Sequence, residues 1–354
     1  MRILQFIDSL AVGGAERMAV NLANLFTRKG IPNILITSRE IGPLQVYVTA
    51  SESLFCLEKK STLDIIAFAR LVKIAKKFKP THLHVHDSSI YWAALLKKFL
   101  PNTTLIWHAH YGGLVGDEGR FGSKIKYISS HIDLVITVNQ ELRNWVKRGF
   151  SDIKEVAYIE NFPDLPQKIN RGNTRPEILC LANLKTPKNH HLLIRSFAEF
   201  LKKFPHYKLK LVGSTDDQEY VNSLKEEIAA LNIQASVIFA GETLDLISSF
   251  EDAEFAVLSS DIEGLPVSLL ELGLAQVPII ATWVGQCKEL LGKGKFGFLT
   301  PPGDEKKLYE MLIFVAENRK VAIDKASSFY THVSEKYGFK NFIDKYYILL
   351  NQNN

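Results

Sequence analysis

A nine-residue stretch, EGLPVSLLE, contains the residues best suited to chemistry. It runs from Glu263 to Glu271 and follows an apolar run, Phe255–Leu258, and a short polar turn. Pro266 suits the first turn of a helix. Backbone N–H groups near Val267 would then be free to bind an anion, helped by the helix dipole. The stretch therefore predicts a helix start that binds phosphate.

The two glutamates of this stretch lie eight residues apart, roughly 12 Å along a helix. Carboxylates flanking a phosphate-binding helix start could each hold a hydroxyl-rich group at either end of a diphosphate. Gly264 would let the backbone approach that diphosphate closely. The alternative is that Glu263 only favours the helix dipole and Glu271 lies on a solvated face. The spacing leaves both interpretations open.

A glycine pair marks a second candidate anion site. Gly13 and Gly14 follow an apolar run at Ile3–Ile7 and precede a helical pattern at Ala15–Arg28. A glycine loop that opens onto a helix can cradle a phosphate. A tight turn between strand and helix is the alternative interpretation.

Histidines alternate at the ends of two further apolar runs. His84 and His86 share one face of a predicted strand, and His108 and His110 share one face of the next. A lone histidine is usually structural, whereas four together could suggest a metal site.

Strand and helix patterns alternate along the whole chain, which predicts parallel sheets covered by helices on both faces. Residues 162–176, FPDLPQKINRGNTRP, break the alternation and are the best linker. We therefore expect two Rossmann-like domains, 1–165 and 166–337, with a final helix at 338–354 packing back on the first. Two such sheets facing each other predict a ligand-binding cleft between them.

Composition is that of a folded two-domain protein. The 354 residues are 46% hydrophobic and 23% charged, and three cysteines make a disulfide framework unexpected. Residues 1–164 have a net charge of +6 and the remainder −1. The start, MRILQFIDSL, has no long apolar core. We therefore expect no signal peptide and a cytoplasmic location, at the inner face of the membrane if the protein meets one.

Together these motifs resemble the retaining glycosyltransferases of family 4, which have the GT-B fold. The stretch at 263–271 resembles the family's EX7E motif, and the resemblance covers nearly the whole chain. The other matching segments, in the family's order, are GGAER at 13–17, HVH at 84–86, LVITVNQE at 134–141, NLKTPKNH at 183–190 and LVG at 211–213.

The resemblance implies roles for the residues that would bind the donor. Glu263 would contact the donor sugar and Glu271 the nucleotide ribose. Lys185 and Lys188 would neutralise the donor diphosphate; Lys185 replaces an arginine of the motif and loses its planar fork. The other predicted donor-binding residues are Gly14, Gly264, Leu265, Pro266 and Val267.

The resemblance also implies roles in the N-terminal domain, which binds the acceptor in this fold. The family has a histidine near the transferred sugar, and His110 matches it better than His108. The glycine loop would lie across the cleft from the diphosphate, where Gly13, Gly14 and Glu16 would contact the acceptor. The predicted catalytic residues are His110, Glu263 and Lys188.

We expect no metal ion and no cofactor besides the nucleotide-sugar substrate. The lysines and the helix start make a bridging Mg²⁺ unnecessary. The family is generally metal-independent, and the chain has no DXD motif. Two family glycines are replaced by Gln276 and Gln286, which puts the donor preference in doubt.

The predicted function is transfer of a sugar from a nucleoside-diphosphate sugar, UDP in preference to GDP, to a hydroxyl of a glycan or lipid-linked acceptor in cell-surface glycan synthesis. A nucleotide-sugar epimerase and a catalytically silent sugar-nucleotide-binding subunit remain alternatives. The basic N-terminal half predicts peripheral contact with anionic membrane, with solvated lysines as the alternative. Nucleic acid is not an expected partner, because no recognition motif accompanies the charge.

Overall fold

The structure, a computed structural model, divides the chain into two compact units. Unit 1 comprises Met1–Phe162 and Phe339–Asn354, and unit 2 comprises Pro163–Gly338. Part of the linker expected at 162–176 lies outside the described residues. The described residues are 1–110, 121–165, 169, 171–172, 174–243 and 245–351.

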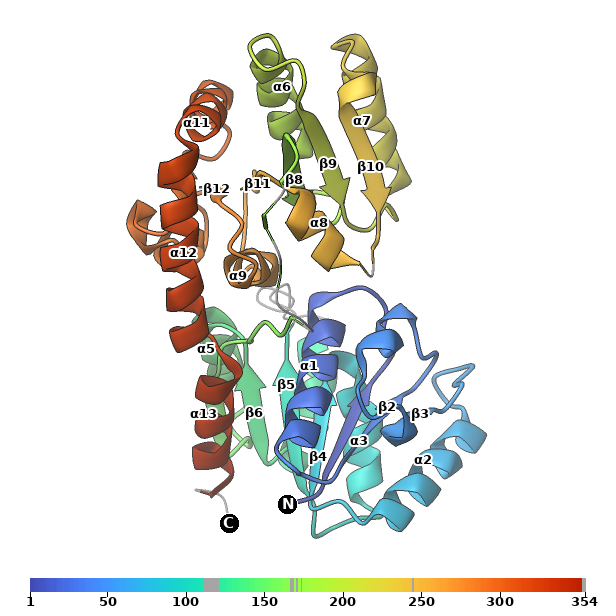
Figure 1. Ribbon diagram of the computed structural model, residues 1–354. Helices are drawn as coiled ribbons and strands as arrows, with labels where there is room; N and C mark the ends of the chain where they lie inside the picture. The colour runs from blue at the N-terminus through green and yellow to red at the C-terminus, as the bar shows by residue number, and fades with distance from the viewer. Residues whose placement is uncertain (111–120, 166–168, 170, 173, 244, 352–354) are drawn as a thin grey trace. The chain divides into compact units, whose positions relative to one another are not determined.

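Unit 1 is built on a parallel sheet with strand order β3-β2-β1-β4-β5-β6-β7 (Figure 1). The central strands are buried on both faces, as parallel strands covered by helices must be, although β4 and β5 include buried histidines. The edge strand β3 has no counterpart in the sequence pattern, because it is only three residues long and half-buried. The strands are β1 (Ile3–Ile7), β2 (Asn33–Thr37), β3 (Leu54–Cys56), β4 (His82–His86), β5 (Thr104–Ala109), β6 (Leu134–Thr137) and β7 (Glu155–Tyr158).

Helices cover both faces of this sheet. One face packs against α1 and α13 and the other against α2, α3 and α5. The C-terminal helix α13 buries Phe342, Tyr346 and Leu349, whose spacing places them on one side of a helix. The helices of unit 1 are α1 (Gly14–Arg28), α2 (Ile65–Phe78), α3 (Ile90–Lys97), α4 (Phe121–Lys126), α5 (Gln140–Gly149) and α13 (Phe339–Asn351).

Unit 2 repeats the architecture with strand order β10-β9-β8-β11-β12-β13, again all parallel. Apolar side chains from both faces of the sheet form two buried clusters against the surrounding helices. The strands are β8 (Glu177–Leu181), β9 (Lys208–Val212), β10 (Val237–Gly241), β11 (Phe255–Leu258), β12 (Ile279–Thr282) and β13 (Phe298–Thr300).

Two helices of unit 2 differ from the pattern expected from sequence. The helix α9 begins at Val267, and Pro266 precedes it in an extended conformation instead of lying in its first turn. The helix α12 begins at Arg319, well before the aromatic-rich segment that indicated a C-terminal helix. The helices are α6 (His190–Leu201), α7 (Gln218–Ala230), α8 (Leu246–Asp252), α9 (Val267–Leu274), α10 (Cys287–Leu290), α11 (Glu305–Glu317) and α12 (Arg319–Lys336).

Each sheet has one point where the strand order reverses direction. In unit 1 it lies between β1 and β4, and in unit 2 between β8 and β11. Ligands of open α/β sheets bind beyond the carboxyl ends of the strands at such points. The glycine loop at 13–14 follows β1, Lys185 and Lys188 follow β8, and the stretch at 263–271 follows β11. Across the described residues, every helix is too short or too polar to span a bilayer.

Candidate active site

An ion pair joins the loops that follow β8 and β11 in unit 2. The Nζ of Lys188 lies 2.7 Å from Oε1 of Glu263, whose side chain is only 7% exposed. Ser260 donates a second hydrogen bond of 2.6 Å to the same oxygen. Because both bonds end on Oε1, Oε2 is available for another donor. An ammonium group offers three N–H donors, so Lys188 also keeps donors for a further anion.

Hydrogen bonds between the two loops hold this pair in place. The hydroxyl of Ser259 donates to the backbone carbonyls of Lys188 and Asn189, at 3.1 and 3.0 Å. The side-chain amide of Asn189 donates to Asp261 at 2.8 Å. The hydroxyl of Thr282, at the end of β12, fixes the carbonyl of Ser260 at 2.6 Å. These hydrogen bonds fix the Lys188–Glu263 pair at the carboxyl ends of β8 and β11.

The start of α9 lies directly after this pair. No side chain caps it, so its first N–H groups are not satisfied by a local side chain. Gly264 is exposed, whereas Pro266 is buried. Gly285 has a left-handed φ of 49°, and a Cβ there would collide with the carbonyl oxygen of Glu263. Gly285, which directly precedes Gln286, thus permits the close packing of the backbone against Glu263.

The remaining predicted donor residues lie on the same elements. Glu271 is on α9 and its side chain is buried, which excludes the solvated face that its spacing had left open. Leu265 and Val267 are partly buried at the helix start, and Lys185 is exposed in the loop of Lys188. The structure therefore brings Lys188 and Glu263 into contact and leaves Lys185 pointing toward solvent.

Two buried thiols and one imidazole surround the pair without offering a nucleophile. Burial raises the pKa of Cys180 to about 12 and that of Cys287 to about 12. Burial, reinforced by the charge of Lys188, lowers the pKa of His190 to about 4. Because thiolate is the reactive form of cysteine, neither thiol is suited to covalent catalysis at neutral pH.

In unit 1 the glycine loop meets the first turn of α1. Gly13 precedes the helix, and a Cβ at this position would collide with the carboxylate of Glu16. Gly14 is the exposed first residue of α1. Burial, together with the nearby carboxylates of Asp87 and Asp8, raises the pKa of Glu16. The three predicted acceptor residues therefore lie together at the end of β1.

Sequence reasoning missed Asp8 and Asp87. Asp87 accepts a hydrogen bond of 2.8 Å from the backbone N–H of His110, and Asp8 accepts one of 3.0 Å from Ser88. Both aspartates follow strands at the reversal point, directly after β1 and β4. Their position at strand ends was visible in the sequence, but the adjacency of β1 and β4 depends on the sheet order.

The four histidines form one group: His84 and His86 on β4 and His108 on β5 are buried, and His110, directly after β5, is half-buried. Ring nitrogens of His84, His86 and His108 lie within 4.8 Å of one another. Hydrogen bonds join His84 to His108 at 3.1 Å and His86 to His110 at 2.9 Å. Imidazole nitrogens are ligands for zinc and other transition metals. Here several of these nitrogens are engaged with one another, and metal independence stays a prediction.

Two family models match the chain in tandem. Glycosyltransferase Family 4 matches residues 12–166, and Glycosyl transferases group 1 matches residues 161–329. They meet where the chain passes from unit 1 to unit 2.

Relatives and solved structures agree with these matches. The O-antigen biosynthesis glycosyltransferase WbnH of Escherichia coli is 26% identical, over 79% of this chain and 80% of its own. The E. coli UDP-Gal:alpha-D-GlcNAc-diphosphoundecaprenol alpha-1,3-galactosyltransferase is 22% identical over 88% of this chain and 87% of its own. HepE of Anabaena, crystallised with UDP and glucose, superposes with a TM-score of 0.80 at 18% identity over 99% of each chain. The chain belongs to the family 4 glycosyltransferases and has their GT-B fold.

Proposed function

We propose that this enzyme transfers a hexose from a UDP-sugar, with retention at the anomeric carbon, to a hydroxyl of a glycan or lipid-linked acceptor in cell-surface polysaccharide synthesis. The Lys188–Glu263 pair supports the proposal most strongly, because it sets a cation and a hydroxyl acceptor beside an uncapped helix start. Relatives named for O-antigen synthesis and for UDP-galactose support the pathway and the donor base.

The chemical barrier lies in breaking the bond between the anomeric carbon and the diphosphate. In our proposal the departing diphosphate rests against the start of α9, where Lys188 and the exposed Lys185 neutralise its charge. Preorganised groups of this kind contribute several kcal/mol in a site that excludes water. Glu263 would accept a hydrogen bond from a sugar hydroxyl through Oε2, and Glu271 would bind the ribose.

We propose retention from the family resemblance, and neither cysteine thiol beside the pair is suited to forming a covalent sugar–enzyme intermediate. The two nearby thiols, Cys180 and Cys287, are buried and protonated. We therefore propose that the acceptor hydroxyl attacks from the face that the diphosphate leaves, with the leaving phosphate taking its proton. The reaction would require no metal ion, because the lysines and the helix start supply the positive charge.

On the acceptor side we assign roles to the residues at the end of β1 and β5. Gly13, Gly14 and Glu16 would contact the acceptor, with Gly14 also near the donor phosphates. His110 would hydrogen-bond a sugar hydroxyl. All four lie at the carboxyl edge of the sheet in unit 1, the edge at which α/β proteins bind ligands.

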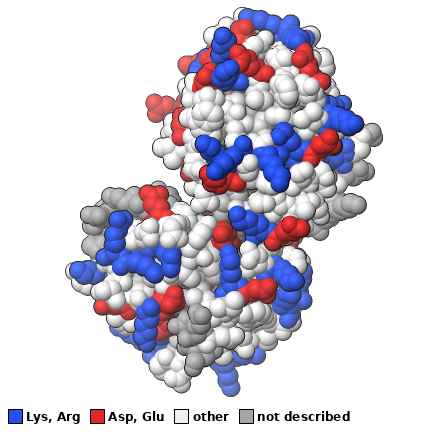
Figure 2. Space-filling view, turned by 90° about the vertical axis from the view of Figure 1, so that its left-hand side faces the viewer, with Lys and Arg blue, Asp and Glu red and all other residues white. Residues whose placement is uncertain are grey.

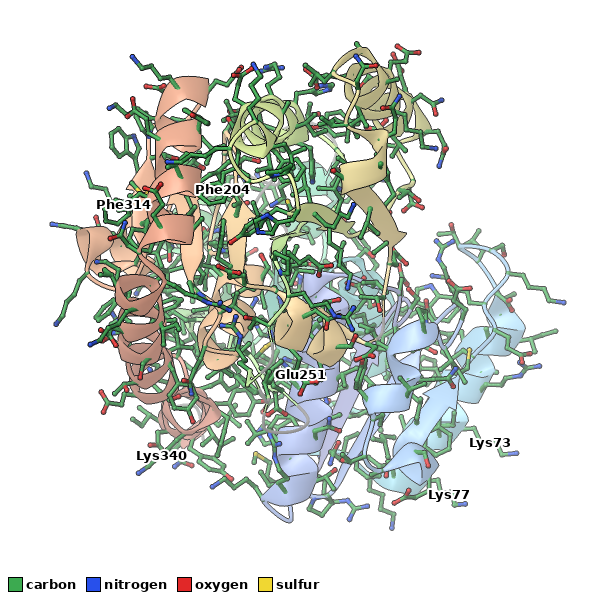
Figure 3. The ribbon with its side chains drawn as sticks, turned by 45° about the horizontal axis from the view of Figure 1, so that its top comes forward. Lys73, Lys77, Phe204, Glu251, Phe314 and Lys340 are labelled. Carbon is green, nitrogen blue, oxygen red and sulfur yellow. The ribbon has the colours of Figure 1, made fainter. Side chains whose placement is uncertain are left out.

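We also propose that unit 1 contacts anionic membrane through the start of α2. Three neighbouring aliphatic side chains are unusually exposed there: Leu63 at 86%, Ile65 at 81% and Ile66 at 69%. Apart from Ala69, the exposed residues further along the helix are basic, and Figure 3 shows Lys73 and Lys77 projecting from α2. Aliphatic side chains that insert and basic ones that meet lipid phosphates suit a bilayer surface.

Transfer assays with a panel of UDP- and GDP-sugars, with and without a glycoside or lipid-linked acceptor, test the function. The proposal predicts a UDP-sugar-dependent product whose new linkage keeps the donor's anomeric configuration by NMR. Conversion of the donor sugar without acceptor would instead indicate an epimerase. Binding without turnover across the panel would indicate a silent subunit.

Variants of the ion pair test the site itself. Lys188→Ala and Glu263→Gln should each lower kcat by about 10²- to 10³-fold, the range seen when one preorganised donor is removed. Lys202→Ala is the matched control, because Lys202 pairs with Glu199 at the same 2.7 Å on the surface of unit 2. If both site variants fold and transfer sugar at the wild-type rate, the assignment is wrong.

A further inference from the structure

The buried histidines of unit 1 are arranged in two separate hydrogen-bonded chains. In the first, Gln5 Oε1 lies 3.2 Å from His86 Nε2, and His86 Nδ1 lies 2.9 Å from His110 Nε2. In the second, the hydroxyl of Tyr346 on α13 lies 3.0 Å from His84 Nδ1, and His84 Nε2 lies 3.1 Å from His108 Nδ1. The first chain ends at the residue placed near the sugar.

Each of these rings is neutral at physiological pH. Burial lowers the pKa of His110 to about 3 and holds the pKa of His86 well below its usual value. A neutral imidazole has one nitrogen that donates a hydrogen bond and one that only accepts. Once one nitrogen of a ring in the chain is assigned, the other nitrogen and the next ring are fixed as well.

The amide oxygen of Gln5 sets the direction of the first chain. In the structure the amide oxygen of Gln5, which can only accept, faces His86, while the amide nitrogen of Gln5 is buried without a partner among the described residues. In this orientation His86 Nε2 carries the proton and His86 Nδ1 accepts. His110 Nε2 then donates to His86, which leaves His110 Nδ1 as a bare lone pair. That nitrogen is buried and has no hydrogen-bond partner among the described residues. Such a buried acceptor needs a donor from outside the described residues, as does the unpartnered His108 Nε2 at the end of the second chain if that nitrogen is unprotonated.

We propose that Gln5, acting through His86, holds His110 in the Nε2–H tautomer and so presents Nδ1 as an acceptor for a sugar hydroxyl. This inference rests on the proposed role of His110 at the transferred sugar. Gln5 and His86 are positioning residues, since neither is placed against substrate. Gln5 is fully buried in the middle of β1, and the register pairs it with His84 on β4. A residue of the central strand β1 thus determines which ring nitrogen of His110 is protonated.

The second chain provides a matched control. A tyrosine hydroxyl can donate or accept, so Tyr346 imposes no direction on His84 and His108. Removing either chain's terminal group deletes one buried hydrogen bond in the same cluster. The variants Gln5→Met and Tyr346→Phe each keep most of the side-chain volume. Only Gln5→Met should affect His110.

NMR of the full-length protein labelled with ¹⁵N-histidine reads the tautomer without substrate. His110 is assigned from the signals lost in His110→Gln. We expect protonated Nε2 and bare Nδ1 in the wild type, in Tyr346→Phe and in Gln5→Glu, and a mixture of tautomers in Gln5→Met. A protonated Nδ1 in the wild type, or an unchanged tautomer in Gln5→Met, would overturn the inference.

Kinetics test the consequence for the reaction. With the donor identified by the transfer panel, Gln5→Met should lower kcat roughly tenfold, as expected for one weakened hydrogen bond. Tyr346→Phe should leave kcat near the wild-type value, and neither variant should change the affinity for UDP alone. A shifted tautomer with unchanged kcat would refute the contact between Nδ1 and a sugar hydroxyl. The failure of any UDP-sugar to react would refute the proposed function without altering the NMR result.

Discussion

At the scale of single residues, the contact between Lys188 and Glu263 links the two loops of unit 2 that the motifs indicated. The sequence could predict this pair because both residues stand in matching motifs after apolar strands. It could not predict the roles of Ser260, which donates a hydrogen bond to Glu263, or of Gly285, which packs against the backbone carbonyl of Glu263. Their roles depend on the packing of β12 and its following turn against the loop of β11, and no local pattern reports that packing.

Gly285 offers a test at this scale. In Gly285→Ala the left-handed φ costs about 1–2 kcal/mol of folding free energy, and the new methyl group displaces the carbonyl of Glu263. We expect at least a tenfold loss of UDP affinity by calorimetry. Gly30→Ala is the control, because Gly30 has a similar φ of 65° with open space around its Cβ position. Equal UDP affinity in both variants would argue against this account of the loop.

The buried histidines predict how stability depends on pH. Folding lowers the pKa of His84 and that of His110 from 6.5 to about 3, so the unfolded chain binds more protons between these values. The free energy of unfolding therefore has its full value above about pH 6.5 and falls as the pH decreases toward 3. Each ring steepens the loss by up to about 1.4 kcal/mol per pH unit.

Urea unfolding followed by tryptophan fluorescence measures this slope, since Trp107 is buried on the strand that carries His108. Replacing one ring by a carbon isostere, His108→Phe, should flatten the slope between pH 6.5 and 4. His206→Gln, at an exposed site of unit 2, should leave it unchanged. A wild-type stability that is constant from pH 7 to 4 would contradict the burial of neutral rings.

At the scale of elements, the alternating pattern predicted nearly every strand and helix, because parallel strands buried on both faces are continuous apolar runs. The exceptions have physical causes. The strand β3 is too short and too exposed to produce such a run. Pro266 was expected in the first turn of α9 but directly precedes that helix, because its backbone is extended where the chain turns between Glu263 and α9. Sheet order, which creates both reversal points, is not encoded in local pattern at all.

The start of α2 is the element whose exposure predicts membrane contact. Replacing Leu63, Ile65 and Ile66 by serine should abolish sedimentation with vesicles of phosphatidylserine and phosphatidylcholine. Each buried aliphatic side chain contributes about 1.5–3 kcal/mol, and each basic residue about 1 kcal/mol. Lys73→Glu with Lys77→Glu should weaken binding and remove its salt dependence.

Two comparisons make the vesicle experiment specific. Val321→Ser with Ile323→Ser, on exposed positions of α12, should bind vesicles like the wild type. Vesicles of phosphatidylcholine alone should bind the wild type weakly. Equal sedimentation of the α2 triple variant and the wild type would show that these aliphatic residues serve another purpose.

At the scale of the whole molecule, the excess positive charge is confined to one half of the chain. The net positive charge lies entirely in residues 1–164. On the face shown in Figure 2, basic and acidic side chains are interspersed. The basic stretch of α2 lies on the other side of unit 1 (Figures 1 and 2). The half that we propose to bind the acceptor is therefore also the half with the excess positive charge.

The most direct test of the account is a crystal structure with bound UDP. We predict that the diphosphate lies within hydrogen-bonding distance of Lys188 Nζ and of the first N–H groups of α9, with the ribose hydroxyls on Glu271. A nucleotide whose phosphates lie away from Lys188 and α9 would contradict the proposed leaving-group site, whatever the fold around it.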